Sequence, residues 1–292
     1  MGREFFGSLP AMVTPFRDGA IDEPAMRGFI DWQIEAGTHG LVPCGTTGES
    51  ATLSHSEHRR VIELTLEHVA GRVPVMAGCG SNATAEAVGL AKDAAAMGAD
   101  ALLVVTPYYN KPNQEGLLAH FRAVADATDR PLYIYNIPGR SVIDMTVETM
   151  ATLAQHPNIV GVKDASGDPT RMSAQRHACG AGFIQLSGND DQTLGLMAMG
   201  ARGAISVTAN VAPAMCAQFL DACIAGDFET AITINDRLFP LHKALFCSPS
   251  PGPAKYALAK LGHISGEVRL PILPPDPEAC AQIDAALRHA GL

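Results

Sequence analysis

One run of this sequence is NIVGVKDAS, from Asn158 to Ser166, and it places Lys163 at the end of a short apolar segment. Such a run predicts a buried strand, and lysine is almost never fully buried unless its charge is paired. Burial lowers the pKa of an ammonium group and leaves some free amine at neutral pH. Two interpretations follow: a strand-end lysine that extends to solvent, or an amine that attacks a ketone and forms a Schiff base.

The position of Lys163 within its run leaves both interpretations open. It is the only one of the chain's lysines that lies in a strand-like apolar run. Alternation along a strand predicts that Ile159, Gly161 and Lys163 share one face. Gly161 is then expected to leave space beside the lysine stem. Asp164 is expected to point to the other face, in a structural role.

Similar apolar runs recur along the chain at even intervals, with helical stretches between them. Counting the run that ends at Lys163, they are residues 7–13, 40–44, 74–78, 101–105, 131–135, 159–163, 183–186 and 204–207. Continuous apolar strands alternating with helices predict parallel strands covered by helices. Eight such units are the number that closes a (β/α)₈ TIM barrel. The alternative is a doubly wound open sheet, but no G-x-G-x-x-G motif follows the first strand.

Helix signals support this alternation and then continue alone. Residues 57–70 are preceded by Ser54, which forms a capping-box signature with Glu57, and residues 83–97 end before Gly98. After about residue 224 no strand signal remains. Three helices are predicted there, at residues 228–245, 253–261 and 277–290. We therefore expect a catalytic barrel over residues 1–224 and a three-helix region over residues 225–292.

Composition excludes several classes of partner. The 292 residues are 47% hydrophobic and carry a net charge of −9 with no basic run, so neither nucleic acid nor an anionic membrane is an expected partner. No apolar stretch is long enough to span a bilayer, and the start, from Met1 to Phe5, lacks the apolar core of a signal peptide. The seven scattered cysteines and ten histidines show no metal-binding spacing. A cytoplasmic protein with reduced thiols and no metal site is expected.

In a barrel, chemistry takes place at the carboxyl ends of the strands. The run at 40–44 ends in GTTGE, residues 45–49, where Thr46 and Thr47 offer hydroxyl and backbone donors to a carboxylate. This segment lacks the G-K-[ST] ending of a phosphate-binding loop. Taken alone, it is equally compatible with a simple strand-to-helix connection.

Aromatic and basic residues gather near two neighbouring strand ends. Four of the five tyrosines are Tyr108, Tyr109, Tyr133 and Tyr135. A phenol beside an amine can donate and accept protons, although aromatic packing would explain the same cluster. Arg140 follows the run at 131–135 and is a candidate clamp for a substrate carboxylate, or else a solvated surface charge.

Together these residues resemble the dihydrodipicolinate synthase / N-acetylneuraminate lyase family of Schiff-base enzymes. The motifs that carry the resemblance are GTTGE at 45–49, YNIP at 135–138, GVKD at 161–164 and GPAK at 252–255, so it covers the whole chain. The resemblance implies a (β/α)₈ barrel with a C-terminal helical extension. It also implies a homotetramer, built as a dimer of dimers, with no metal and no organic cofactor.

Within the family, three features resemble the dihydrodipicolinate synthase branch. Arg140 matches an arginine that binds the carboxylate of aspartate semialdehyde, which neuraminate lyases lack. The segment TPYYNKP, residues 106–112, matches one whose second tyrosine, here Tyr109, reaches into the neighbouring subunit's site. The pair Thr46-Thr47 stands where neuraminate lyases have Ser-Thr. Gly139 departs from the usual Ser or Ala, which puts the rigidity of the Arg140 loop in doubt.

The resemblance implies how the first substrate is held. Lys163 attacks the ketone of pyruvate and forms an imine. Thr46 and Thr47 hold the pyruvate carboxylate, with help from the backbone near Ile205.

It also implies the second half of the reaction. Loss of a methyl proton gives an enamine, which attacks the aldehyde of L-aspartate-4-semialdehyde held by Arg140. Tyr135, Thr46 and Tyr109 relay the protons, and ring closure through the substrate amine frees Lys163. The protein would then be a hydro-lyase of the diaminopimelate route to L-lysine.

A second, regulatory site is also implied by the resemblance. Positions that bind L-lysine at a dimer interface in lysine-regulated members match Ser50, Ala51, His55, His58, Asn82, Glu86 and Tyr108. Glu86 could pair with an ammonium, and His55 and His58 would share one helix face. The alternative is that Asn82 caps a helix and both histidines are solvated. We expect feedback inhibition by L-lysine.

Two other functions remain open at this point. One is another pyruvate-dependent aldolase of the family, acting on N-acetylneuraminate or on a 2-keto-3-deoxy sugar acid. The other is a ligand-binding relative that kept the fold and lost catalysis.

Overall fold

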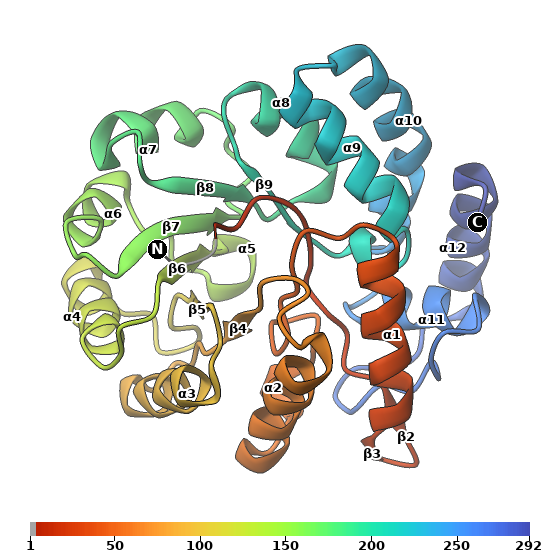
Figure 1. Ribbon diagram of the computed structural model, residues 1–292, viewed down its shortest axis with the longest axis horizontal. Helices are drawn as coiled ribbons and strands as arrows, with labels where there is room; N and C mark the ends of the chain where they lie inside the picture. The colour runs from red at the N-terminus through yellow and green to blue at the C-terminus, as the bar shows by residue number, and fades with distance from the viewer. Residues whose placement is uncertain (1–3) are drawn as a thin grey trace.

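A seven-stranded sheet forms the centre of the molecule (Figure 1). The computed structural model describes residues 4–292. The strands of the sheet are β1 (Gly7–Pro10), β4 (Met76–Gly78), β5 (Ala101–Val105), β6 (Leu132–Asn136), β7 (Ile159–Asp164), β8 (Ile184–Ser187) and β9 (Gly203–Ser206). They are hydrogen-bonded in the order β1-β9-β8-β7-β6-β5-β4, and each neighbouring pair is parallel.

The predicted strand at residues 40–44 closes this sheet into a ring. Leu41 forms a parallel bridge with Val75, directly before β4, and Val42 forms a parallel bridge with Ala11, directly after β1. The segment therefore stands between the two edge strands, although its pairing is too short to count as a strand of the sheet. All eight predicted strands take part in the ring. The (β/α)₈ barrel is confirmed, and the doubly wound open sheet is wrong.

A small hairpin that the sequence analysis did not predict follows β1. Its strands are β2 (Phe16–Arg17) and β3 (Ala20–Ile21), which pair antiparallel. The two residues between them, Asp18 and Gly19, have φ of 53° and 80°. A two-residue Asp-Gly turn with positive φ at both positions matches the twist of a hairpin. The signal was present in the sequence but short beside the longer apolar runs.

Helices enclose the ring of strands (Figure 1). They are α1 (Glu23–Glu35), α2 (His55–Val69), α3 (Thr84–Met97), α4 (Gln114–Ala125), α5 (Pro138–Ser141), α6 (Val147–Leu153), α7 (Arg171–Cys179), α8 (Thr193–Ala198) and α9 (Pro213–Ala225). Three short 3-10 turns accompany them: η1 (Ser50–Thr52), η2 (Asp190–Gln192) and η3 (Thr208–Asn210). Both η2 and η3 begin within three residues of the carboxyl ends of β8 and β9.

The start of α2 and the end of α3 are where the caps in the sequence predict them. At the start of α2, Glu57 N donates to Ser54 Oγ at 3.3 Å, and Ser54 N donates to Glu57 Oε2 at 2.8 Å. This reciprocal pair is the predicted capping box. Helix α3 ends at Met97, and Gly98 follows with a φ of 96°, which a residue without a Cβ adopts at little cost.

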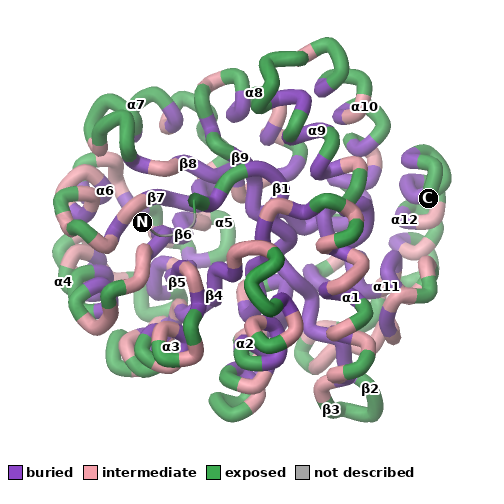
Figure 2. The backbone as a smooth tube through the Cα atoms, in the orientation of Figure 1, coloured by how far each residue is buried: buried purple, intermediate pink, exposed green. Residues whose placement is uncertain are grey.

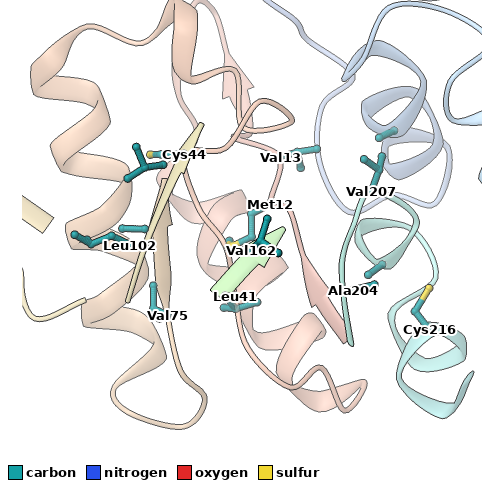
Figure 3. Close-up of a cluster of buried hydrophobic side chains, with 14 of the residues drawn as sticks. Met12, Val13, Leu41, Cys44, Val75, Leu102, Val162, Ala204, Val207 and Cys216 are labelled. Atoms are coloured by element: carbon teal, nitrogen blue, oxygen red, sulfur yellow. The ribbon is translucent and has the colours of Figure 1, made fainter. Parts of the chain in front are cut away.

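Buried residues follow the barrel strands and parts of the surrounding helices (Figure 2). Their apolar side chains form two clusters, one inside the barrel and one between the strands and the helices. The inner cluster draws on every barrel strand and on no helix; Leu9, Met76, Leu103, Tyr133 and Ile205 belong to it. The outer cluster joins the other face of the strands to the helices (Figure 3). The alternation of side chains along each strand produces these two layers.

The C-terminal part of the chain is helical, as predicted. Its helices are α10 (Phe228–Ala244), α11 (Gly252–Lys260) and α12 (Pro277–Ala290), which lie on one side of the barrel (Figure 1). Helix α10 packs against both α9 and α12. Leu241 of α10 and Leu258 of α11 belong to the same outer cluster as the barrel helices. The division into units 1–224 and 225–292 stays a prediction.

Within residues 4–292, no helix is both long enough and apolar enough to cross a membrane. The expectation that the chain begins without a signal peptide rests partly on Met1, Gly2 and Arg3. These three lie outside the described residues.

Candidate active site at the rim of the barrel

Strands β6 and β7 carry two predicted site residues to the same end of the barrel. Tyr135 and Lys163 are partners in the register of these strands, each one residue before its strand ends. Lys163 Nζ lies 4.1 Å from the centroid of the Tyr135 ring. The structure therefore places the candidate amine against the candidate phenol at the carboxyl end of the strands, where barrel enzymes perform their chemistry.

The face of β7 that carries Lys163 differs in one residue from the expectation. The register slips at the start of the strand: Leu132 pairs with Ile159, and Tyr133 pairs with Gly161. The skipped residue, Val160, is a bulge, which breaks the simple alternation. Ile159 packs in the outer cluster. The prediction that Ile159 shares a face with Lys163 is therefore wrong.

The side chain of Lys163 is buried, and only 6% of the residue is exposed to solvent. The pKa of Lys163 is lowered to about 7, chiefly by burial and also by the nearby Arg140, while Asp190 opposes the shift. At neutral pH roughly half of the amine is then uncharged, compared with a negligible fraction for a solvated lysine of pKa about 10.4. The strand-end lysine that extends to solvent is excluded.

A different glycine from the expected one makes room for the lysine. A Cβ on Gly188, just after β8, would lie 3.2 Å from Lys163 Cε and 2.8 Å from Ala165 Cβ. A Cβ on Gly161 would instead strike Ile184 O at 2.4 Å and Tyr133 Cε1 at 2.8 Å. Gly161 thus allows the Tyr133 ring and β8 to approach. The space beside the lysine stem belongs to Gly188, so the expectation for Gly161 was wrong.

Asp164 has the structural role that was predicted for it. Its carboxylate accepts from Arg171 Nε at 3.2 Å and from Gln175 Nε2 at 2.6 Å, both on α7. It also accepts from the backbone N–H of Ser166 at 2.8 Å. These bonds fix the strand end directly after Lys163.

Tyr135 is a buried phenol with a polar neighbour. Burial raises the pKa of Tyr135 to about 12, while Arg140 and a hydrogen bond with Thr46 work against the shift. The phenol is therefore protonated at neutral pH and can donate a proton. Its contact with Thr46 links β6 to the GTTGE segment across the barrel rim.

A cavity of about 240 Å³ opens at this end of the barrel. Its lining includes two predicted site residues, Thr46 and Arg140, whereas neither Lys163 nor Tyr135 is part of it. Ser50, Ala51 and Tyr108 line it as well. A cavity of this size, with a guanidinium and hydroxyls on its wall, suits a small carboxylate substrate.

The remaining predicted site residues differ in how far they are buried. Thr47 is buried within its turn, and Ile205 is buried in the inner cluster on β9. Tyr109 is 89% exposed and has a φ of 71°. Within a single chain the Tyr109 phenol is thus presented outward and is not enclosed in the cavity.

A second, smaller pocket of about 120 Å³ adjoins the first. Six of the seven residues predicted for L-lysine line it, and they are Ser50, Ala51, His55, His58, Glu86 and Tyr108. The larger cavity is also lined by Ser50, Ala51 and Tyr108, so the cavity and the smaller pocket share a wall.

The alternatives considered for this second pocket are partly excluded. Asn82 does not cap α3, because the N-cap is Ala83, which makes no side-chain cap bond. His58 is buried, and its Nε2–H donates to Gly78 O at 2.9 Å, so it is not solvated. His55 is exposed and donates to Glu86 Oε1 at 2.5 Å. Asn82 itself is absent from the lining.

Sequence reasoning missed three polar or small residues of this region. Asp190 is buried beside Lys163, and its Oδ2 accepts from Val207 N and Thr208 N, each at 3.0 Å. Ser81 donates to Glu86 and was not singled out. Gly188 is the third. Asp190 and Gly188 both follow the predicted strand at 183–186, so examining that strand's end as closely as the others would have found them.

Within the described part of the chain, no three His, Cys, Asp or Glu side chains are arranged to hold a metal ion. The chemistry of the rim is that of an amine, phenols, hydroxyls and a guanidinium.

Comparison with known proteins agrees with this geometry. The model of the dihydrodipicolinate synthetase family matches residues 4–290. The 4-hydroxy-tetrahydrodipicolinate synthase of Methylobacterium radiotolerans is 60% identical over 291 residues, covering 100% of this chain and 97% of its own.

Solved structures are equally similar. The chloride-inhibited dihydrodipicolinate synthase of Acinetobacter baumannii, complexed with pyruvate, superposes with a TM-score of 0.96 at 44% identity, covering 98% of this chain and 99% of its own. The enzyme of Cyanidioschyzon merolae, with lysine bound, has a TM-score of 0.95 at 40% identity, covering 99% and 100%. The present chain therefore belongs to the dihydrodipicolinate synthetase family.

Proposed function

We propose that this enzyme condenses pyruvate with L-aspartate-4-semialdehyde, the reaction of a 4-hydroxy-tetrahydrodipicolinate synthase. The observation that carries the proposal is the buried amine of Lys163, whose pKa lies near 7, against the Tyr135 ring at the barrel rim. The full-length identity to a synthase of that name supports the choice of reaction. The protein is then a hydro-lyase in the diaminopimelate route to L-lysine, and its compartment is the cytoplasm.

The first step joins Lys163 to pyruvate. The neutral amine attacks the ketone carbon, and the resulting carbinolamine loses water to form an imine. Thr46 and Thr47 hold the carboxylate through the hydroxyls and N–H groups of their turn, and the backbone at Ile205 assists from β9. The pyruvate complex of the Acinetobacter baumannii enzyme supports the choice of this keto acid.

The second step forms the carbon–carbon bond. The imine loses a proton from its methyl group and becomes an enamine, whose carbon attacks the aldehyde of L-aspartate-4-semialdehyde. The aldehyde oxygen takes up a proton and becomes a hydroxyl. Arg140 binds the substrate carboxylate from the loop that follows β6, a placement supported by its position in the cavity wall. The substrate amine then displaces Lys163 from the imine carbon, which closes the ring and regenerates the free amine.

Proton transfer is assigned to a relay of Tyr135, Thr46 and Tyr109. The protonated phenol of Tyr135 and its bond with Thr46 supply the first part of this relay. Tyr109 is 89% exposed in one chain, so its phenol would complete the site of a neighbouring subunit. A homotetramer, built as a dimer of dimers, is the assembly we propose.

The smaller pocket is proposed to bind L-lysine as a feedback inhibitor. Glu86 offers a carboxylate to an ammonium group, next to His55 and Tyr108. The lysine complex of the Cyanidioschyzon merolae enzyme supports this choice of ligand. Because the pocket shares a wall with the larger cavity, a bound amino acid could act on Ser50 and Ala51 of that wall.

The reaction is tested by a coupled assay in which pyruvate and L-aspartate-4-semialdehyde are supplied together and the product is reduced by an added reductase. We expect turnover with the wild type, none with Lys163→Ala, and unchanged turnover with Lys260→Ala, a surface lysine of α11. Cleavage of N-acetylneuraminate or of a 2-keto-3-deoxy sugar acid, without condensation, would show a different aldolase. L-lysine added at millimolar concentration should lower the rate; an unchanged rate would refute the regulatory site.

A further inference from the structure

A buried ion pair joins the C-terminal helices to the candidate carboxylate-binding turn. Lys255, on α11, places its Nζ 2.5 Å from Oε1 of Glu49, the last residue of GTTGE. Their side chains are 0% and 3% exposed. None of the steps proposed above uses either residue, although both are ionisable groups held away from water.

Each charge of the pair has further partners. Lys255 Nζ donates to Glu267 O at 2.8 Å and lies 4.0 Å from the centroid of the Phe16 ring. Glu49 Oε2 accepts the backbone N–H of Arg269 at 2.9 Å. Besides the ion pair, each charge therefore has one hydrogen bond with a backbone group, which offsets part of the cost of burying it.

Such a pair adds little stability compared with apolar residues of the same size, because removing two charges from water is costly. The pair does fix the positions of its two residues, because either charge would be buried without a partner if it moved away. The location of the pair therefore indicates which segment is held in one conformation.

Glu49 closes the turn that carries Thr46 and Thr47. Its backbone N–H donates to Thr46 O at 3.1 Å, and its φ of 55° lies in the left-handed region, which is strained for a residue with a side chain. The preceding Gly48 O accepts from Thr14 Oγ1 at 2.7 Å. The side chain of Glu49 thus holds an unfavourable backbone conformation beside the threonines.

A second anchor from the same C-terminal segment holds the residues that follow. Arg269 Nη1 donates to Thr52 O, the last residue of η1, at 3.0 Å. Its Nη2 pairs with Glu57 Oε1 on α2 at 2.5 Å. Between these anchors lie Ser50 and Ala51, which line both cavities.

We propose that Lys255 is a positioning residue for pyruvate: through Glu49 it holds the Thr46-Thr47 turn in the conformation that receives the substrate carboxylate. The proposal rests on the proposed function, because it assigns the turn to pyruvate. It gives the C-terminal helices a direct role at the active site.

The test is Lys255→Met, which keeps most of the length of the side chain and removes its charge. The buried carboxylate of Glu49 then has no cationic partner, and the Thr46-Thr47 turn is no longer held in its conformation. We expect the KM for pyruvate to rise by about tenfold, because the displaced turn no longer holds the substrate carboxylate well. The KM for L-aspartate-4-semialdehyde should stay within about twofold of the wild type, because Arg140 lies on another loop. Lys260→Met is the matched control: Lys260 lies at the surface of the same helix, its ammonium pairs with Asp284 of α12, and both KM values should stay unchanged.

The double variant Lys255→Met/Glu49→Gln leaves no stranded charge, so it remains informative if the single variant does not fold. It should show the same rise in the pyruvate KM. A folded double variant with a wild-type pyruvate KM would overturn the proposal, and so would a double variant that fails to fold, since the pair would then act in folding alone. Condensation of pyruvate with L-aspartate-4-semialdehyde by the wild type is measured in the same experiment. Its absence would refute the proposed function, a result distinct from an unchanged pyruvate KM in the folded double variant.

Discussion

At the scale of single residues, the chemistry depends on how far Lys163 is removed from water. Burial lowers its pKa to about 7. Because only the neutral amine attacks a ketone, the rate of imine formation with pyruvate should rise through about pH 7 and level off above about pH 8. Stopped-flow mixing across this range measures it. A rate that keeps rising towards the pKa of a solvated lysine, about 10.4, would contradict the assigned environment.

Gly188 offers a second prediction at this scale. An added methyl group would lie 2.8 Å from Ala165 Cβ and 3.2 Å from Lys163 Cε. Gly188→Ala should lower the free energy of unfolding by about 1–3 kcal/mol, the usual cost of overpacking, and should slow imine formation. Gly195→Ala is the control, because no heavy atom lies within 4 Å of its added Cβ. Urea unfolding compares the two; equal midpoints would show that Gly188 has room to spare.

The structure explains which features of these residues could be predicted from the sequence and which could not. The apolar run singled out Lys163 as a candidate without deciding whether it is buried, and the strand ends identified Thr46, Tyr135 and Arg140 as further candidates. Strict alternation then failed at Ile159, because the bulge at Val160 depends on pairing with β6. Such a slip depends on the neighbouring strand, so the sequence of β7 alone could not predict it.

At the scale of elements, the site depends on the segment between β1 and α3. Helix α2 supplies His55 and His58 to the smaller pocket and begins at a capping box. Ser54→Ala removes the cap and should lower the free energy of unfolding by about 1 kcal/mol. It should also weaken inhibition by L-lysine with little change in the uninhibited rate. Thr233→Ala, which removes an exposed hydroxyl bonded only within α10, to Glu229 O at 3.0 Å, is the control. Inhibition curves equal for both variants would contradict this role of the helix start.

Most elements were predictable because each has a local signal. Apolar runs predicted the barrel strands, and caps predicted the limits of α2 and α3. The segment at 40–44 was predicted as a strand but makes only isolated bridges. The hairpin β2–β3 was missed because its strands are two residues each. Its turn signal, Asp18-Gly19, was overlooked.

At the scale of the whole molecule, the proposal that Tyr109 acts in a neighbouring subunit has a direct test. Tyr109→Phe and Lys163→Ala should each be nearly inactive alone. When the two variants are unfolded together and refolded, mixed dimers should contain one site with an intact Lys163 and a Tyr109 from the other chain. Activity should therefore reappear. If Tyr109 serves its own chain, no mixture regains activity.

The same scale shows where sequence reasoning reaches its limit. Contacts such as Lys255–Glu49 join residues more than two hundred positions apart, and no local pattern indicates them. The motifs GTTGE and GPAK each carried half of that ion pair, but only the fold brings the halves together.

The central claim is that Lys163 is the amine that binds pyruvate, and borohydride reduction in the presence of pyruvate tests it most directly. The reduced imine is a stable bond, so digestion and mass spectrometry should find one added pyruvate unit on the peptide that contains Lys163. Lys163→Ala should gain none, while Lys260→Ala should be labelled as fully as the wild type. Labelling of Lys163→Ala to the same extent as the wild type, or the absence of label from all three proteins, would contradict the account.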